Sequence, residues 1–179
     1  MTSRTTLSTA LPRSARRPVT SWLIGMAMVV LLLLPGGTTA LASQPAAANG
    51  TLIVTEITGF SPSPAGANLI IQQTTEGVST GSLTGVFVDE LKAVLHPNGK
   101  IGAQGTITCI CTVDGRSGTL TLVQTTLGSA FSQTFDGHAV IIGGTGDLSG
   151  LHGTFELQGT VDANGLATIT YSGQIHFDR

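Results

Sequence analysis

From residue 51 onward, apolar and polar side chains alternate along short segments that are separated by turn residues. Alternation with a period of two is the pattern of a half-buried β-strand, and no segment repeats apolar residues at the helical spacing of three and four. We predict one strand in each of eight segments, which are residues 51–60, 67–76, 82–95, 101–113, 117–126, 131–142, 152–161 and 166–177.

The connections between these segments are short and rich in Gly, Asn and Asp. Pro97-Asn98-Gly99-Lys100 is the clearest turn, because Asn-Gly readily adopts the positive φ angles of a tight hairpin. Short connections make consecutive strands antiparallel neighbours. Closing the sheet into a ring removes the exposed strand edges of an open sheet. We therefore predict an all-β fold over residues 51–179, an eight-stranded antiparallel β-barrel, with a β-sandwich as the alternative.

Parity predicts which side chains line the interior, because successive side chains point to opposite faces of a strand. In residues 101–113, for example, Ile107, Cys109 and Cys111 share one face and threonines occupy the other. The apolar faces of the strands supply our candidates for the lining of a ligand cavity, which are Phe87, Cys109, Cys111, Gln133, Phe135, Phe155 and Tyr171.

Segment 82–95 is exceptional because both of its faces are apolar. Asp89 shares a face with Phe87 and Leu91, whereas Glu90 shares the other with Val86 and Val88. Burying an unpaired carboxylate is costly, so an inward one needs a raised pKa or a hydrogen-bond partner such as Gln124, Gln133 or Tyr171. Asp89 and Glu90 are thus weak candidates for a catalytic acid. In the alternative, a bulge or the barrel rim places both in water.

The sequence contains two cysteines, Cys109 and Cys111. Residues two apart in an extended strand have Cα atoms about 6.5–7 Å apart, at the edge of what a disulfide can bridge. We therefore predict two reduced, buried cysteines. A Cys-x-Cys pair without nearby His or further Cys also lacks the ligands of a zinc site, so we predict no metal and no cofactor.

The first 42 residues have the three parts of a secretory signal. Their basic start contains four arginines, an apolar stretch follows over residues 22–34, and Ala40-Leu41-Ala42 matches a cleavage site. The apolar stretch makes roughly 20 Å of helix, short of the ~30 Å hydrocarbon core of a membrane. We predict cleavage after Ala42, secretion, and a flexible tether over residues 43–50. The alternative is an uncleaved N-terminal membrane anchor.

Removal of this segment leaves an acidic domain. This domain contains four Lys and Arg residues in total and ten Asp and Glu residues, which gives a formal charge of −6. A domain of this charge does not attract nucleic acid. We expect a small apolar molecule as partner, membrane contact only through an uncleaved signal, and a homo-oligomer if the face with Val86, Val88 and Val94 is exposed.

Two glycine-containing segments carry a family resemblance. They are Gly115-Arg116-Ser117-Gly118-Thr119-Leu120 and the stretch from Gly143 to Gly153, GGTGDLSGLHG. Together they resemble the bacterial domain-of-unknown-function family three-two-two-four, whose small barrels are related in shape to allene oxide cyclases and dirigent proteins. The resemblance implies an eight-stranded, calycin-like barrel with a ligand-sized interior. It implies no reaction and no catalytic residue.

No recognisable catalytic set accompanies this fold, so a binding role is favoured over an enzymatic one. We expect an exported module that binds a small apolar ligand or a surface partner. The alternatives are a cyclase or isomerase that uses the cavity with Asp89 or Glu90, and a structural surface protein with a fully packed barrel.

Overall fold

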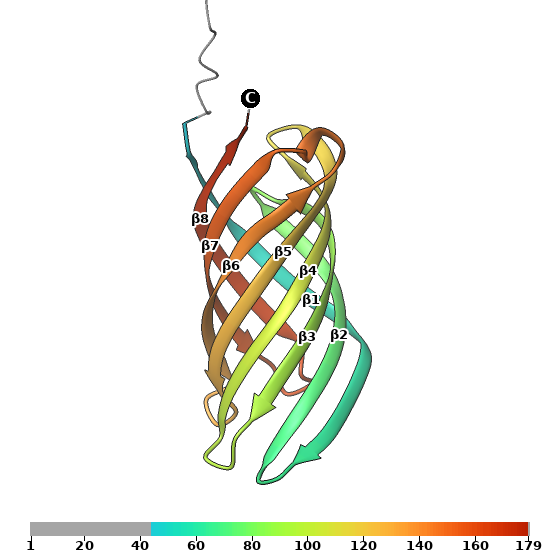
Figure 1. Ribbon diagram of the computed structural model, residues 1–179, viewed down its shortest axis with the longest axis vertical. Coiled ribbons are helices and arrows are strands. Elements are labelled where there is room, and N and C mark those ends of the chain that lie inside the picture. Colours follow the sequence, from blue (N-terminus) through green and yellow to red (C-terminus); the bar gives the residue numbers. More distant parts are fainter. Residues whose placement is uncertain (1–43, 179) are drawn as a thin grey trace, which may run out of the picture. The chain divides into compact units, whose positions relative to one another are not determined.

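The computed structural model describes residues 44–178, and the predicted signal segment lies outside them. Eight antiparallel strands pair in chain order, and β8 pairs with β1 to close the barrel (Figure 1). The predicted barrel is confirmed. Its strands are β1 Ala46–Ala65, β2 Asn68–Gly81, β3 Thr84–Leu95, β4 Lys100–Val113, β5 Arg116–Ser129, β6 Thr134–Gly144, β7 Leu151–Val161 and β8 Ala167–Phe177.

Strand β1 is longer at both ends than the sequence pattern predicts. Residues 46–50 pair with β8, so most of the predicted tether belongs to the barrel wall. The alternation of apolar and polar residues is weak there because the residues are small. They form a strand because closure of the ring pairs them with β8, although their intrinsic β-strand propensity is low. At the other end, β1 continues through Pro62 and Pro64 while paired only with β2. Proline is tolerated there because it lies in an edge segment, which bends outward from the barrel (Figure 1).

Strand β6 begins later than predicted. Its first residue is Thr134, and Phe131 and Gln133 lie in the turn after β5. Gln133 has a φ angle of 54°, which interrupts the extended backbone on which the parity argument depends. As a result, Phe131 and Gln133 are exposed in the turn, whereas Phe135, Ala139 and Ile141 of β6 face the interior.

The two ends of the barrel differ. The connections β1–β2, β3–β4, β5–β6 and β7–β8 gather at one end, which we call the hairpin end (Figure 1). The opposite end, which we call the plugged end, carries the short 3₁₀ helix η1, Gly146–Leu148. Leu148 is fully buried there together with Leu120 and Val113. The glycine-rich connection thus reverses the chain and supplies an apolar plug.

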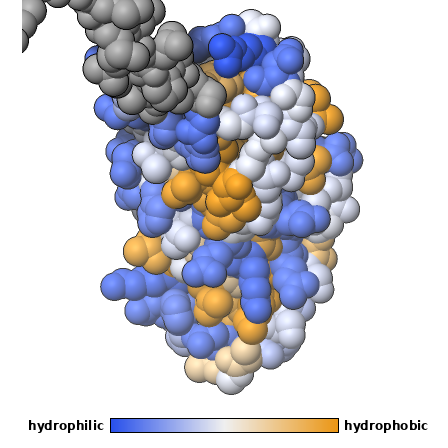
Figure 2. Space-filling view, turned by 45° about the horizontal axis from the view of Figure 1, so that its top comes forward, coloured by the Kyte–Doolittle hydropathy of each residue, from blue (hydrophilic) through white to orange (hydrophobic). Residues whose placement is uncertain are grey.

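The outer wall is polar, with apolar side chains in small groups, as Figure 2 shows for one face. One such group crosses four neighbouring strands, because Ile53, Val78, Val86 and Ile110 are consecutive partners in the strand register and all are exposed. Within residues 44–178, no helix is long and apolar enough to cross a membrane.

Candidate functional site

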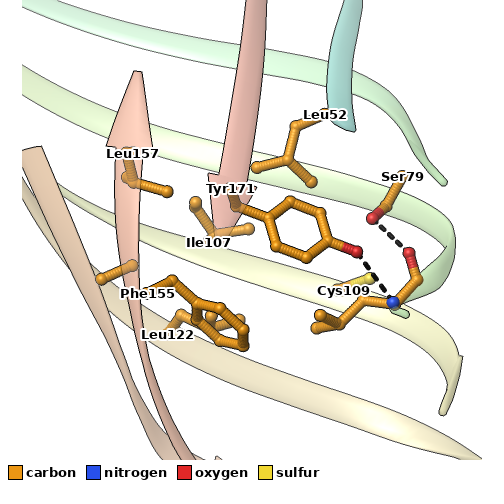
Figure 3. A pocket seen from close by; sticks show the side chains of 10 residues that line it. Leu52, Ser79, Ile107, Cys109, Leu122, Phe155, Leu157 and Tyr171 are labelled. Carbon is orange, nitrogen blue, oxygen red and sulfur yellow. Dashed lines mark hydrogen bonds between the residues drawn. The ribbon is translucent and has the colours of Figure 1, made fainter. Parts of the chain in front are cut away.

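The half of the barrel next to the plugged end is closely packed. A void there measures about 20 Å³, which holds at most one water molecule (Figure 3). Phe155 and Tyr171 meet edge to face there, with ring centroids 5.4 Å apart. The Tyr171 hydroxyl accepts a hydrogen bond from the Leu83 N–H at 2.8 Å and donates one to the Thr80 carbonyl at 2.9 Å. These bonds tie β8 to the β2–β3 turn.

Five of the predicted cavity residues lie in this packed half. They are Phe87, Cys109, Cys111, Phe155 and Tyr171, and each is at most 5 % exposed. Their inward orientation follows the parity argument. They fill the interior, however, so they form the floor beneath the ligand-sized space and not its walls.

Cys109 and Cys111 form a disulfide, which corrects the prediction of two reduced cysteines. Their Cα atoms are 5.4 Å apart, closer than in a fully extended strand and within the usual disulfide range. The twist of the barrel strand shortens this distance, and a flat-strand estimate does not include it.

We expect the disulfide in protein purified under oxidising conditions, because such conditions preserve these bonds. Alkylation of the denatured protein without a reductant should leave both cysteines unmodified, and the intact mass should lack two hydrogen atoms relative to the reduced chain. Reduction before denaturation serves as the control and should make both thiols reactive. Labelling of the unreduced protein would restore the prediction of free thiols.

A large cavity occupies the other half and opens at the hairpin end. Its volume is about 670 Å³, in the range of sites for drug-sized molecules. All eight strands contribute to its wall, and most of the lining is apolar, including Val54, Ile57, Leu91, Ala93, Ala103, Phe135, Val161 and Ile169. Gln133 and residues 162–165 of the β7–β8 turn surround the mouth.

Apart from Ser129, Thr134 and the turn residues at the hairpin end, the polar side chains of the cavity lie on one arc of the wall. Strands β2, β3 and β5 contribute Gln73, Thr75, Asp89, Gln124 and Thr126. The strand between β3 and β5 contributes the small Ala103, and the opposite arc, from β7 through β8 to β1, is apolar apart from the turn residues at the mouth. The cavity therefore offers hydrogen bonds on one side and hydrophobic contact on the other.

Asp89 is the centre of this polar arc. It is buried on the inner face of β3, and its Oδ2 accepts a hydrogen bond from Gln124 Nε2 at 2.8 Å. Its second oxygen, Oδ1, and the Oγ1 of the cross-strand neighbour Thr75 are buried and have no hydrogen-bond partner within residues 44–178. Native proteins leave few buried polar atoms unpaired, so two such atoms beside a cavity make this place a candidate binding site.

Gly105 makes the contact between Asp89 and Gln124 possible. It lies on β4 between the two strands that carry them and pairs with Leu91 on one side and Gln124 on the other. A Cβ atom at this position would come within 3.1 Å of Asp89 Oδ1 and within 2.7 Å of the Glu90 carbonyl oxygen. Only glycine leaves room for a side-chain bridge across the intervening strand.

Burial raises the pKa of Asp89 from 3.8 to about 7. The removal of water disfavours the charged carboxylate, the hydrogen bond from Gln124 opposes this effect, and the nearby charge of Glu90 adds to it. A carboxyl group with such a pKa changes its charge near neutral pH. Asp89 is therefore able to donate or accept a proton, or to bind a cation.

The four predicted site residues outside the packed half lie in three different places. Asp89 and Phe135 line the cavity, and Gln133 lies at its mouth. Glu90 points outward, so the structure separates the two candidate acids. Sequence reasoning missed Gln73, Thr75 and Thr126, because polar residues at inward positions of a strand look like those of a solvated face.

Comparison with solved structures shows the same fold. The chain is similar to a protein of unknown function from the DUF3224 family of Shewanella oneidensis MR-1, with 17 % identity, a TM-score of 0.55, and coverage of 76 % of this chain and 99 % of that one. It is also similar to a pterocarpan synthase dirigent protein, with 13 % identity, a TM-score of 0.48, and coverage of 89 % and 100 %. No family model and no curated protein matches the sequence. The chain thus has a barrel fold like that of the DUF3224 structure, in agreement with the resemblance seen in the sequence.

Proposed function

We propose that this protein is exported and binds a small, mainly apolar molecule in the cavity at the hairpin end. The observation that carries the proposal is the cavity itself, about 670 Å³ of largely apolar space inside an otherwise well-packed barrel. Keeping such a space empty forfeits packing and hydrophobic stabilisation, and an apolar ligand would recover both. The same cavity argues against a structural role that needs a fully packed barrel.

A retained ligand is the direct test. Native mass spectrometry of the protein purified from its own secretion medium should show a bound small molecule and an N-terminus at Ser43. Ala103→Phe should abolish this retention, because Ala103 lines the cavity and the larger side chain would occupy it.

Gln104→Phe provides the matched control. Gln104 is the next residue of β4 and points outward, so retention should persist in this variant. A wild-type protein that carries no molecule, and whose melting temperature no apolar compound raises, would contradict the proposal.

Acid–base catalysis within the cavity is the second candidate function. The observation that favours it is the buried Asp89, whose pKa of about 7 suits proton transfer near neutral pH. Prolonged incubation of the retained molecule with the protein separates the two functions. Recovery of the unchanged molecule supports binding, and its chemical conversion by wild type but not by Asp89→Asn supports catalysis.

A further inference from the structure

The cavity is acidic as well as apolar. Among the residues that the structure describes, its ionisable lining residues are Asp89 at the inner end and Asp162 at the mouth, with no Lys, Arg or His. Hydrogen bonds from the backbone N–H groups of Leu166 and Asn164 hold the pKa of Asp162 below its usual range, so this residue is ionised at neutral pH. A molecule that enters the cavity passes one carboxylate and ends near another.

Asp89 lacks a cationic partner among residues 44–178. Its hydrogen bond comes from the neutral amide of Gln124. In residues 44–178, the one ion pair joins His152 to Asp178 on the outer surface. Buried carboxylates are normally paired with a cation, and an unpaired one raises the free energy of the folded state. Folding has already removed water from Asp89. A cationic ligand would therefore be attracted to the carboxylate, and binding would not have to supply the desolvation free energy of this group.

We propose that the ligand of this cavity is an organic cation, an apolar body with one protonated amine, bound with its ammonium group at Asp89. This inference rests on the proposed function, because it names the chemical class that the same cavity takes. The apolar body would lie against the opposite arc, where Val54, Ile169 and Phe135 line the wall.

The surroundings of Asp89 suit an ammonium group. Such a group has three N–H donors and no acceptor. Asp89 is a charged acceptor, and the Oγ1 of Thr75 lies buried without a partner. The Oε1 of Gln124 accepts no hydrogen bond from any residue in the described part of the chain. Three residues with acceptor atoms therefore line the cavity side by side on β2, β3 and β5.

Other head groups fit less well. A carboxylate would place a second negative charge beside Asp89, and a hydroxyl would satisfy one hydrogen bond but leave the charge unpaired. The exported domain, with a formal charge of −6, also attracts cations and repels anions over longer distances.

Binding of an ammonium group requires ionised Asp89, so affinity should depend on pH. The strands packed around Asp89 present Thr75, Ile107, Leu122 and Gln124. Glu90 on the outer face of β3 is the titratable group whose charge acts on Asp89, and the other ionisable residue of the cavity lining is Asp162 at the mouth. None of these is basic. Affinity should level off above pH 8 and fall about 100-fold by pH 5, since each unit below the Asp89 pKa of about 7 costs a factor of about ten.

Calorimetric titration with octylamine, octanol and octanoate tests this inference, because the three probes share one apolar body. At pH 8, octylamine should bind at least about tenfold more tightly than octanol, and octanoate should bind most weakly. Asp89→Asn should weaken octylamine binding at least about tenfold and leave octanol within about twofold. Glu90→Gln removes the adjacent carboxylate, which points outward. This variant should change neither the affinity for octylamine nor the affinity for octanol.

The outcomes separate this inference from the proposed function. Equal affinity for octylamine and octanol, or octylamine binding that Asp89→Asn leaves intact, would overturn the cation preference while the cavity remained a binding site. Loss of octylamine binding in Glu90→Gln but not in Asp89→Asn would place the cation on the outer surface and overturn the inference too. Failure of all three probes to bind would count against the proposed function itself.

Discussion

Asp89→Asn is expected to stabilise the barrel at pH 8 by up to about 4 kcal/mol and to leave it almost unchanged at pH 4. The pKa of Asp89 rises from 3.8 to about 7 on folding, so the folded state holds this proton more tightly than the unfolded chain. The stability that protonated Asp89 gives to the folded state is therefore fully present below pH 3.8, and it is lost as the pH rises through about 7. Asparagine keeps an oxygen that can accept the Gln124 hydrogen bond and carries no charge to desolvate.

Urea unfolding of wild type and variant between pH 4 and pH 8 measures this difference directly. Glu90→Gln is the control, because it removes the neighbouring carboxylate from the outer face of the same strand. Its stability should follow the wild-type profile, with at most a small upward displacement at high pH from relief of the repulsion with Asp89. Parallel profiles for wild type and Asp89→Asn would mean that the Asp89 carboxyl group is solvated, and the cation site would lose its basis.

The pattern of the sequence predicted this site better than it predicted the strand ends. Asp89 stood out because it shares a face with Phe87 and Leu91 on a strand whose other face is also apolar. Such a conflict between residue type and position indicates a special environment. Parity could not show that Gln124 reaches Asp89 across an intervening strand, since this depends on the absence of a side chain at Gly105 and on the register of three strands.

The remaining errors share a cause, because each depends on a tertiary constraint. The extension of β1 through two prolines requires an edge that faces no neighbour, and the disulfide requires the shortened Cα separation of a twisted strand. The left-handed backbone of Gln133 places Phe131 and Gln133 in an exposed turn and not on the inner face of a strand. The division into a packed and an open half depends on which aromatic side chains meet across the interior, and no single strand contains that information.

Leu120→Ala is expected to destabilise the protein by about 3–4 kcal/mol, because a fully buried leucine leaves a cavity that the surrounding structure fills only in part. Leu120 lies on β5 between Cys109 of β4 and Gly144 of β6, in the apolar core of the plugged end. Chemical denaturation should show the loss as a lower midpoint with an unchanged slope.

Leu127→Ala on the same strand is the matched control, since Leu127 is 71 % exposed and its truncation should change stability by less than about 0.5 kcal/mol. The comparison bears on function, because the packed half fixes the floor of the cavity and holds β3 and β5 in the register that joins Asp89 to Gln124. Octylamine binding should therefore survive in Leu127→Ala. A decrease of less than about 1 kcal/mol in the free energy of unfolding of Leu120→Ala would show that the plugged end is loosely packed. The packed half would then not be a rigid floor for the cavity.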